Sequence, residues 1–278
     1  MRAKITAPVQ NQQQNQSMPT LAYQIHPGDG PFMALLHGFL SSAAQWQDNL
    51  QALATVCRPV TIELWGHGNS PVPEDDHSYQ PAGYVAALEA LREALGAEQW
   101  LLCGYSISAG LTTRYAHTYP QRTLAHILTN SISGFADLAQ QREWQANEEL
   151  SASNIESGGL AAIERMPIHP KRARNLPQHV TKALIEDAQR LSPFGVAQAL
   201  RHTIPNVSVR DIAADNPRPA LLCHGIHEHR FASYVDWAAA NMARLQVVEL
   251  DAGHGVNMQD APGFNQAVIQ FVHQACRA

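Results

Sequence analysis

The sequence predicts an α/β protein with a doubly wound, mostly parallel sheet and a helical cap insertion. Six short apolar runs alternate with amphipathic helical segments along most of the chain. Near-continuous apolar strands are typical of a sheet that is covered on both faces, and therefore of parallel strands. The alternation stops between about residues 134 and 216, where helical pieces and prolines replace the apolar runs.

The expected elements follow in order along the chain. The strand-like runs are FMALLHG (32–38), VTIEL (60–64), QWLLCGY (99–105), LAHILTN (124–130), PALLCHG (219–225) and LQVVELDAG (245–253). Helical periodicity lies between or after them in YVAALEALREAL, ASYVDWAAANMARL and FNQAVIQFVHQAC. We therefore expect a core of residues 20–133 and 217–278, a cap of residues 134–216, and a solvated Gln/Asn-rich arm of residues 1–19.

Composition argues against several classes of function. The 278 residues carry a formal net charge of −5 with no basic stripe, so nucleic acid is a poor candidate for a partner. No run of 18 apolar residues and no secretory signal is visible, so we expect no membrane span and a cytoplasmic location. The four cysteines form no C-x-x-C pair, which favours inert core thiols in a reducing compartment.

The segment CGYSISAG (103–110) places Ser106 in a strand-to-helix turn. It resembles the G-x-S-x-G nucleophile elbow, except that Ser108 stands where the second glycine is usual. Such a turn presents the serine at the edge of the sheet, and the helix N-terminus behind it favours negative charge. Ser108 is small enough to leave the turn intact, and we interpret it as a packing substitution.

Two further segments supply what an acyl transfer needs. LLHGFLSSAAQW (35–46) ends a predicted strand, and the backbone N–H groups of Phe39 and Ile107 are the natural pair of donors for an oxyanion. DAGHGVNMQDAPGF places His254 in a glycine-flanked loop after the last strand. A serine hydroxyl is a poor nucleophile until a base takes its proton, and His254 is the best candidate for that base.

The acid that orients the imidazole is expected at the end of a strand. Glu228 lies three residues after Gly225 and is the carboxylate that we favour, which gives the chain order Ser, Glu, His. Asp137 and Asp251 are the alternatives, the first after the strand 124–130 and the second beside His254 in sequence.

These motifs together resemble the α/β-hydrolase fold superfamily, over residues 20–133 and 217–275. LHGF, LWGHGNS, GYS and DAGH occur in the order and spacing of that family. ELWGHGNSPVP (63–73) resembles the D-x-x-G-x-G-x-S loop of the family, with Glu63 and Trp65 in place of more usual residues. Ser106 argues against the dehalogenases and epoxide hydrolases of this fold, which carry an aspartate nucleophile.

The resemblance implies a carboxylesterase-like serine hydrolase that forms an acyl-enzyme on Ser106, His254 and Glu228. A small-molecule ester, thioester or lactone is the expected substrate, with neither metal nor organic cofactor, and with a monomer or homodimer as the expected assembly. Flanking residues expected to line an apolar pocket are Leu40, Tyr105, Phe231 and Val256.

Two other functions stay open. One is a C–C hydrolase or a lyase on the same triad, although the tryptophan that usually follows the histidine of the C–C hydrolases is missing after His254. The other is a very slow or non-catalytic receptor or regulator, since a Ser-x-Ser elbow also occurs in the branch of the family that includes the strigolactone receptors.

Overall fold

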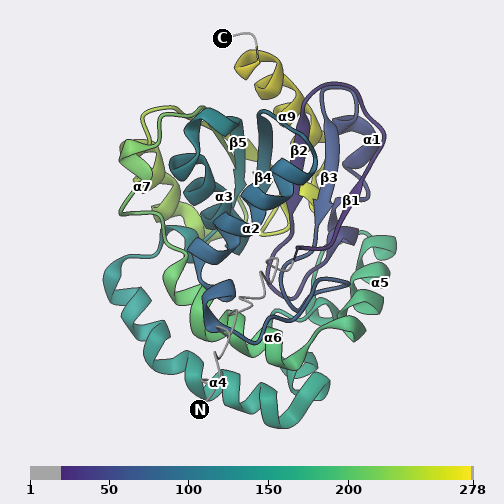
Figure 1. Ribbon diagram of the computed structural model, residues 1–278, viewed down its shortest axis with the longest axis vertical. Coiled ribbons are helices and arrows are strands. Elements are labelled where there is room, and N and C mark those ends of the chain that lie inside the picture. The colour runs from purple at the N-terminus through teal and green to yellow at the C-terminus, as the bar shows by residue number, and fades with distance from the viewer. Residues whose placement is uncertain (1–19, 277–278) are drawn as a thin grey trace, which may run out of the picture.

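The computed structural model describes residues 20–276 and contains one seven-stranded sheet (Figure 1). The strand order is β1-β3-β2-β4-β5-β6-β7. The strands are β1 (Tyr23–Ile25), β2 (Phe32–Leu36), β3 (Arg58–Ile62), β4 (Trp100–Gly104), β5 (Thr123–Thr129), β6 (Ala220–Gly225) and β7 (Leu245–Leu250). β1 runs antiparallel to β3 and all other recorded pairs are parallel, so the predicted fold class is confirmed. The arm expected at 1–19 lies outside the described residues.

Each predicted apolar run contains a strand, but β1 was not expected from the sequence. Its three residues are all exposed, and Tyr23 pairs with Ile62 at the edge of the sheet. A three-residue exposed strand has neither a continuous apolar run nor a readable alternation, so its sequence carries no strand signal.

Helices cover both faces of the sheet, as a doubly wound fold requires. α1 (Leu50–Leu53) and α9 (Ala261–Ala275) pack on one face, while α2 (Pro81–Ala94), α3 (Ile107–Thr118) and α7 (Ala232–Asn241) pack on the other. Side chains of β2 alternate between the two layers, because successive residues of a strand point to opposite faces. Met33 and Leu35 lie in the layer of α1 and α9, and Ala34 and Leu36 lie in the layer of α2 and α3. Both apolar layers are therefore needed to bury the strands.

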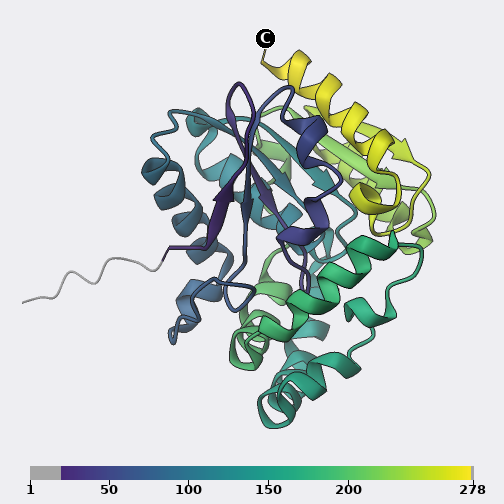
Figure 2. The same ribbon diagram turned by 90° about the vertical axis from the view of Figure 1, so that its right-hand side faces the viewer.

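The segment between β5 and β6 is helical and contains no strand within the described residues. Its longer helices are α4 (Leu138–Arg165), α5 (Gln178–Asp187) and α6 (Pro193–Gln198). Both ribbon views place these helices together below the sheet, at one end of the molecule (Figures 1 and 2). Ile155, Ile163, Val196 and Leu200 form a small apolar cluster there, which also includes Leu40 of the core. This arrangement agrees with a helical insertion, whereas the exact boundaries of cap and core stay a prediction.

Polar contacts attach this insertion to the loops of the core. Ser42 Oγ donates to Asp187 Oδ2 at 2.6 Å, at the end of α5. The imidazole Nε2 of His179 lies 2.8 Å from Asp48 Oδ1. The backbone N–H of Ser192 donates to the carbonyl of Gly66 at 2.8 Å. Among residues 20–276, no helix has the length and apolar character that crossing a membrane requires.

Candidate active site

Ser106 occupies a strained turn between β4 and α3. Its φ of 55° and ψ of −121° lie in a region that residues with a side chain rarely adopt. Two backbone contacts hold the turn: Tyr105 N–H donates to Leu36 O at 3.1 Å, and Ser106 N–H donates to Thr129 Oγ1 at 3.0 Å. A Cβ at Gly104 would lie 2.3 Å from the carbonyl oxygen of Ser108, so only glycine allows the close approach of strand and helix.

Three side chains from distant parts of the chain form a continuous hydrogen-bonded series. The Nε2 atom of His254 lies 3.0 Å from Ser106 Oγ, and its Nδ1 atom lies 2.9 Å from Glu228 Oε2. This geometry fits an imidazole that donates from Nδ1 to the carboxylate and accepts the serine proton at Nε2. The ring of Tyr105 packs edge-on against that of His254, with centroids 5.3 Å apart. The structure therefore brings together the three residues that the sequence nominated.

Glu228 is a buried carboxylate that is held in its ionised form. Its side chain is 9% exposed, whereas that of His254 is 44% exposed. Burial raises the pKa of Glu228, but the hydrogen bond and charge of His254, a hydrogen bond from Asn130 and the charge of Arg230 outweigh burial and leave the pKa below its ordinary value. A negative charge beside Nδ1 is thus available to stabilise an imidazolium.

Asn130 contacts the candidate site but was not predicted as a site residue from the sequence. It follows β5 directly and is completely buried. Its Nδ2 donates to Glu228 Oε2 at 2.9 Å and to Gly225 O at 3.1 Å, and its Oδ1 accepts from Gly225 N–H at 3.1 Å. The end of β5, seven residues before the alternative acid Asp137, thus carries an amide that donates to Glu228. Asp137 instead caps α4, where Oδ1 accepts from Gln140 N–H, and Asp251 Oδ1 lies 2.6 Å from His227 Nε2.

Two backbone N–H groups near Ser106, those of Phe39 and Ile107, are candidate donors to an oxyanion. Within residues 20–276, neither Phe39 N–H nor Ile107 N–H makes a recorded hydrogen bond. The N–H groups next to them are occupied, because Ser106 N–H donates to Thr129 and Leu40 N–H donates to His67 Nε2 at 3.3 Å. Phe39 and Ile107 therefore keep the free donors that the sequence analysis assigned to an oxyanion.

The loop that carries Phe39 is held by a buried histidine. Leu40 has a φ of 57°, which is unusual for a residue with a branched side chain. His67 stabilises this conformation, since its Nδ1–H donates to Trp65 O at 2.9 Å and its Nε2 accepts from Leu40 N–H. Burial, with the charge of His37, lowers the pKa of His67 to about 3, so this imidazole is neutral and able to accept.

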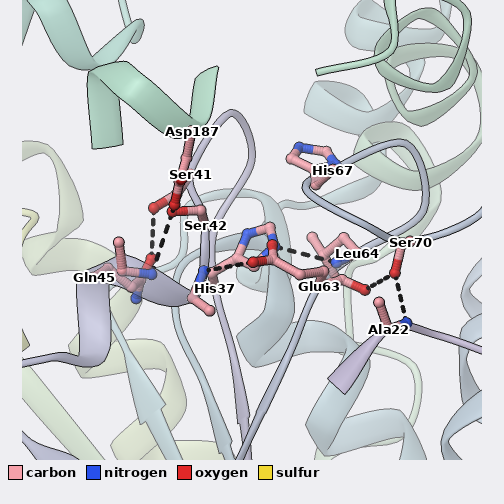
Figure 3. Close-up of polar contacts among 12 residues, drawn as sticks. Ala22, His37, Ser41, Ser42, Gln45, Glu63, Leu64, His67, Ser70 and Asp187 are labelled. Atoms are coloured by element: carbon pink, nitrogen blue, oxygen red, sulfur yellow. Dashed lines mark hydrogen bonds and ion pairs between the residues drawn. The ribbon is translucent and has the colours of Figure 1, made fainter. Parts of the chain in front are cut away.

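Glu63 and Gln45 complete the support of the same loop (Figure 3). Glu63 Oε1 accepts from Ala43 N–H at 3.1 Å, and Glu63 Oε2 lies 2.9 Å from His37 Nε2. Gln45 Oε1 accepts from Gly38 N–H at 3.3 Å. Burial raises the pKa of Glu63, but the charge and hydrogen bond of His37 and the bond from Ala43 outweigh it and lower the pKa overall. The motif ELWGHGNS thus has a structural role, because its Glu63 and His67 accept hydrogen bonds from the loop that carries Phe39.

A cavity of about 630 Å³ opens over Ser106 and His254. Core and cap both contribute to its walls. The lining residues from the core include Phe39, Leu40, Ser41, Tyr105, His227, Asp251 and Met258, and those from the cap include Ile168, Pro170, Ala173, Arg174, Asn175, Leu176 and Leu184. Its size lies in the range of pockets that bind small molecules.

Of the four residues expected to line the pocket, two do so. Leu40 and Tyr105 are part of the cavity wall. Phe231 and Val256 are both fully buried and lie elsewhere, so the expectation for these two is corrected. Phe231 stacks on Tyr234 behind β6, and Val256, the first residue of α8 (Val256–Gln259), packs into the layer under α9. Both residues are close in sequence to Glu228 and His254, but they do not line the cavity, because the backbone directs their side chains into the core.

Comparison with known proteins agrees with this geometry. A model of the α/β-hydrolase fold family matches residues 31–261, which is most of the chain. The chain belongs to the α/β-hydrolase fold family. The resemblance deduced from LHGF, GYS and DAGH is thereby confirmed, as is the expectation of an enzyme of this family.

Individual members of the family are similar only at low identity. A Bacillus subtilis (strain 168) protein provisionally named 2-succinyl-6-hydroxy-2,4-cyclohexadiene-1-carboxylate synthase is 25% identical over 88% of this chain and 92% of its own length. Carboxylesterase YbfK of the same organism is 23% identical over 88% of this chain and 81% of its own.

Solved structures give the same fold. MenH from S. aureus superposes with a TM-score of 0.79 at 19% identity, over 91% of this chain and 98% of that one. The enol-lactonase from Burkholderia xenovorans LB400 superposes with a TM-score of 0.75 at 21% identity, over 91% and 96% of the two chains. At these identities the likeness concerns the fold.

Proposed function

We propose that this α/β-hydrolase cleaves a carboxylic ester through an acyl-enzyme on Ser106, with His254 as general base and Glu228 as the orienting acid. The observation that carries the proposal is the unbroken series Glu228–His254–Ser106, with contacts of 2.9 and 3.0 Å. The similarity to carboxylesterase YbfK supports the ester as substrate. The similarity in fold to an enol-lactonase leaves lactones within the range, and thioesters share the same acyl chemistry.

In the first half of the reaction, Ser106 Oγ attacks the ester carbonyl while its proton passes to His254 Nε2. The π electrons of the carbonyl move onto its oxygen, which becomes an oxyanion. The N–H groups of Phe39 and Ile107 stabilise that negative charge. The Glu228 carboxylate stabilises the imidazolium that forms. When the tetrahedral intermediate collapses, the bond to the alcohol oxygen breaks, and His254 returns its proton to the leaving alkoxide.

In the second half, water attacks the acyl carbon and gives a proton to His254. The bond to Ser106 Oγ then breaks, the serine recovers the proton, and the carboxylic acid leaves. The cap narrows access to the cavity, which limits competition by bulk water for the reacting groups.

Active-site labelling with a fluorophosphonate tests the nucleophile. The wild type and a Ser41→Ala control should both be labelled, because Ser41 lines the cavity without a bond to His254. Ser106→Ala should be unlabelled and should hydrolyse p-nitrophenyl acetate, butyrate and octanoate at least about 10³-fold more slowly than the wild type. Labelling of Ser106→Ala at the wild-type rate, or no labelling of the wild type, would refute the assignment.

A lyase or C–C hydrolase on the same three residues is the second candidate. The observation in its favour is that the B. subtilis relative at 25% identity is named as a synthase, not as an esterase. Mass spectrometry of the products from ester and C–C substrate panels separates the two. Turnover of a C–C substrate with no hydrolysis of any ester would favour this second function.

A further inference from the structure

Ser108 has a contact that a simple packing substitution does not require. It is completely buried in the first turn of α3, two residues after Ser106. Its hydroxyl donates to the carbonyl oxygen of His37 at 2.5 Å, across 71 positions of sequence. Glycine or alanine at this position has no hydroxyl, so neither could make this bond.

This bond joins the two segments that carry the free N–H donors. Phe39 lies two residues after His37, and Ile107 lies directly before Ser108. The ladder between β2 and β4 ends at the pair Leu36 and Gly104, and one more bond follows, from Tyr105 N–H to Leu36 O. Beyond that point, within residues 20–276, the bond from Ser108 to His37 is the recorded hydrogen bond that still connects the two segments.

The position of this connection matters because an oxyanion has to be reached by both donors at once. Each N–H must lie about 2.7 to 3.1 Å from the oxyanion, so a change of a few tenths of an ångström between the segments weakens one of the two bonds. Hydrogen bonds to Glu63, His67 and Gln45 hold the segment that carries Phe39, and Figure 3 shows where these three side chains lie. Those contacts fix the loop to the core, but none of them reaches α3.

We propose that Ser108 is a positioning residue that sets the spacing between the oxyanion donors of Phe39 and Ile107. This inference rests on the proposed acyl-transfer function. Ser108 does not line the cavity, so it acts through the backbone and not on the substrate. The departure from G-x-S-x-G is then functional, because the serine in place of the second glycine makes a hydrogen bond between the segments that carry Phe39 and Ile107.

The test compares Ser108→Ala with Thr113→Val. Thr113 is also fully buried in α3, but its hydroxyl donates to Ala109 O at 2.8 Å within the same helix. Loss of a whole oxyanion donor costs about 10² to 10³ in kcat, and a displaced pair should cost less. Ser108→Ala is therefore expected to lower kcat for p-nitrophenyl acetate by about 10- to 100-fold with KM within about twofold, whereas Thr113→Val stays within about twofold in both.

A second measurement separates positioning from loss of stability. Ser106 Oγ adds to a trifluoromethyl ketone, and the hemiketal that forms carries an oxyanion. Ser108→Ala should therefore weaken binding of this ketone by the same factor by which it lowers kcat. Equal losses of kcat in Ser108→Ala and Thr113→Val, or unchanged binding of the ketone, would overturn the proposal. If the wild type has no turnover, the proposed function fails. Crystal structures of the wild type and of Ser108→Ala then test the positioning role independently of activity. An unchanged separation of the Phe39 and Ile107 nitrogens in Ser108→Ala would then refute it.

Discussion

Replacing Glu228 with glutamine tests whether its charge, apart from its hydrogen bonds, is used in the reaction. Both recorded donors, His254 Nδ1–H and Asn130 Nδ2–H, meet the same oxygen, Oε2. A glutamine that places Oε1 at that point keeps both hydrogen bonds and removes only the charge. The substitution Glu228→Gln is therefore milder than Glu228→Ala, which removes the acceptor as well.

The size of the effect follows from the distance between the charges. A carboxylate 2.9 Å from an imidazolium nitrogen is worth about 6 kcal/mol at an effective dielectric constant of 20, and about 1.4 kcal/mol in bulk water. The side chain of His254 is 44% exposed, which places the pair between these limits. We take about 3 kcal/mol, which corresponds to a loss of about 10²-fold in kcat. For Glu228→Ala, where the tautomer of His254 is also free, we expect about 10³- to 10⁴-fold.

Steady-state hydrolysis of p-nitrophenyl butyrate measures both variants. Asp251→Asn is the matched control, because this carboxylate also lines the cavity but pairs with His227. It should stay within about twofold of the wild type. If Glu228→Gln keeps kcat within threefold of the wild type, the charge is not used. If Glu228→Gln loses as much as Glu228→Ala, the glutamine does not keep the two hydrogen bonds that Oε2 accepts.

Two further predictions concern the core. Gly104→Ala places a Cβ 2.3 Å from the carbonyl of Ser108, so it should destabilise the protein by more than about 3 kcal/mol in urea unfolding; an unchanged midpoint would contradict the close packing. His67 and His126 are buried with their pKa values lowered to about 3, mainly by burial, so between pH 6.5 and 3 the unfolded chain binds protons that the folded protein does not. The free energy of unfolding should therefore decrease as the pH is lowered, and the two histidines together should contribute about 4 kcal/mol between pH 7 and pH 5. His126→Leu should halve that contribution. An equal slope of stability against pH in wild type and variant would refute the prediction.

The sequence predicted the sheet and the proposed triad because both leave local signals. Buried parallel strands are continuous apolar runs, and Ser106 and His254 lie in glycine-flanked turns directly after two of them. The carboxyl ends of parallel strands meet at one edge of the sheet, so residues far apart in sequence could be expected to meet there.

The remainder of the site depends on orientations that such patterns do not contain. Asn130 was not predicted as a site residue, since nothing in LAHILTN indicates that its amide faces Glu228. Phe231 and Val256 were expected in the cavity from their neighbours in sequence, but they face the core. The cap residues of the cavity wall could not be predicted at all, because their positions depend on how α4, α5 and α6 pack on the core.

The division of the site between core and cap bears on how a new substrate range could arise. The recorded contacts that orient Ser106, Glu228 and His254 come from the sheet and the loops at its edge, whereas Ile168 to Leu184 contribute much of the cavity wall. If the proposed function holds, exchanging side chains in that segment should change which molecules fit without moving an atom that transfers a proton. The segment 168–184 is therefore the target that we propose for altering selectivity while retaining the reaction.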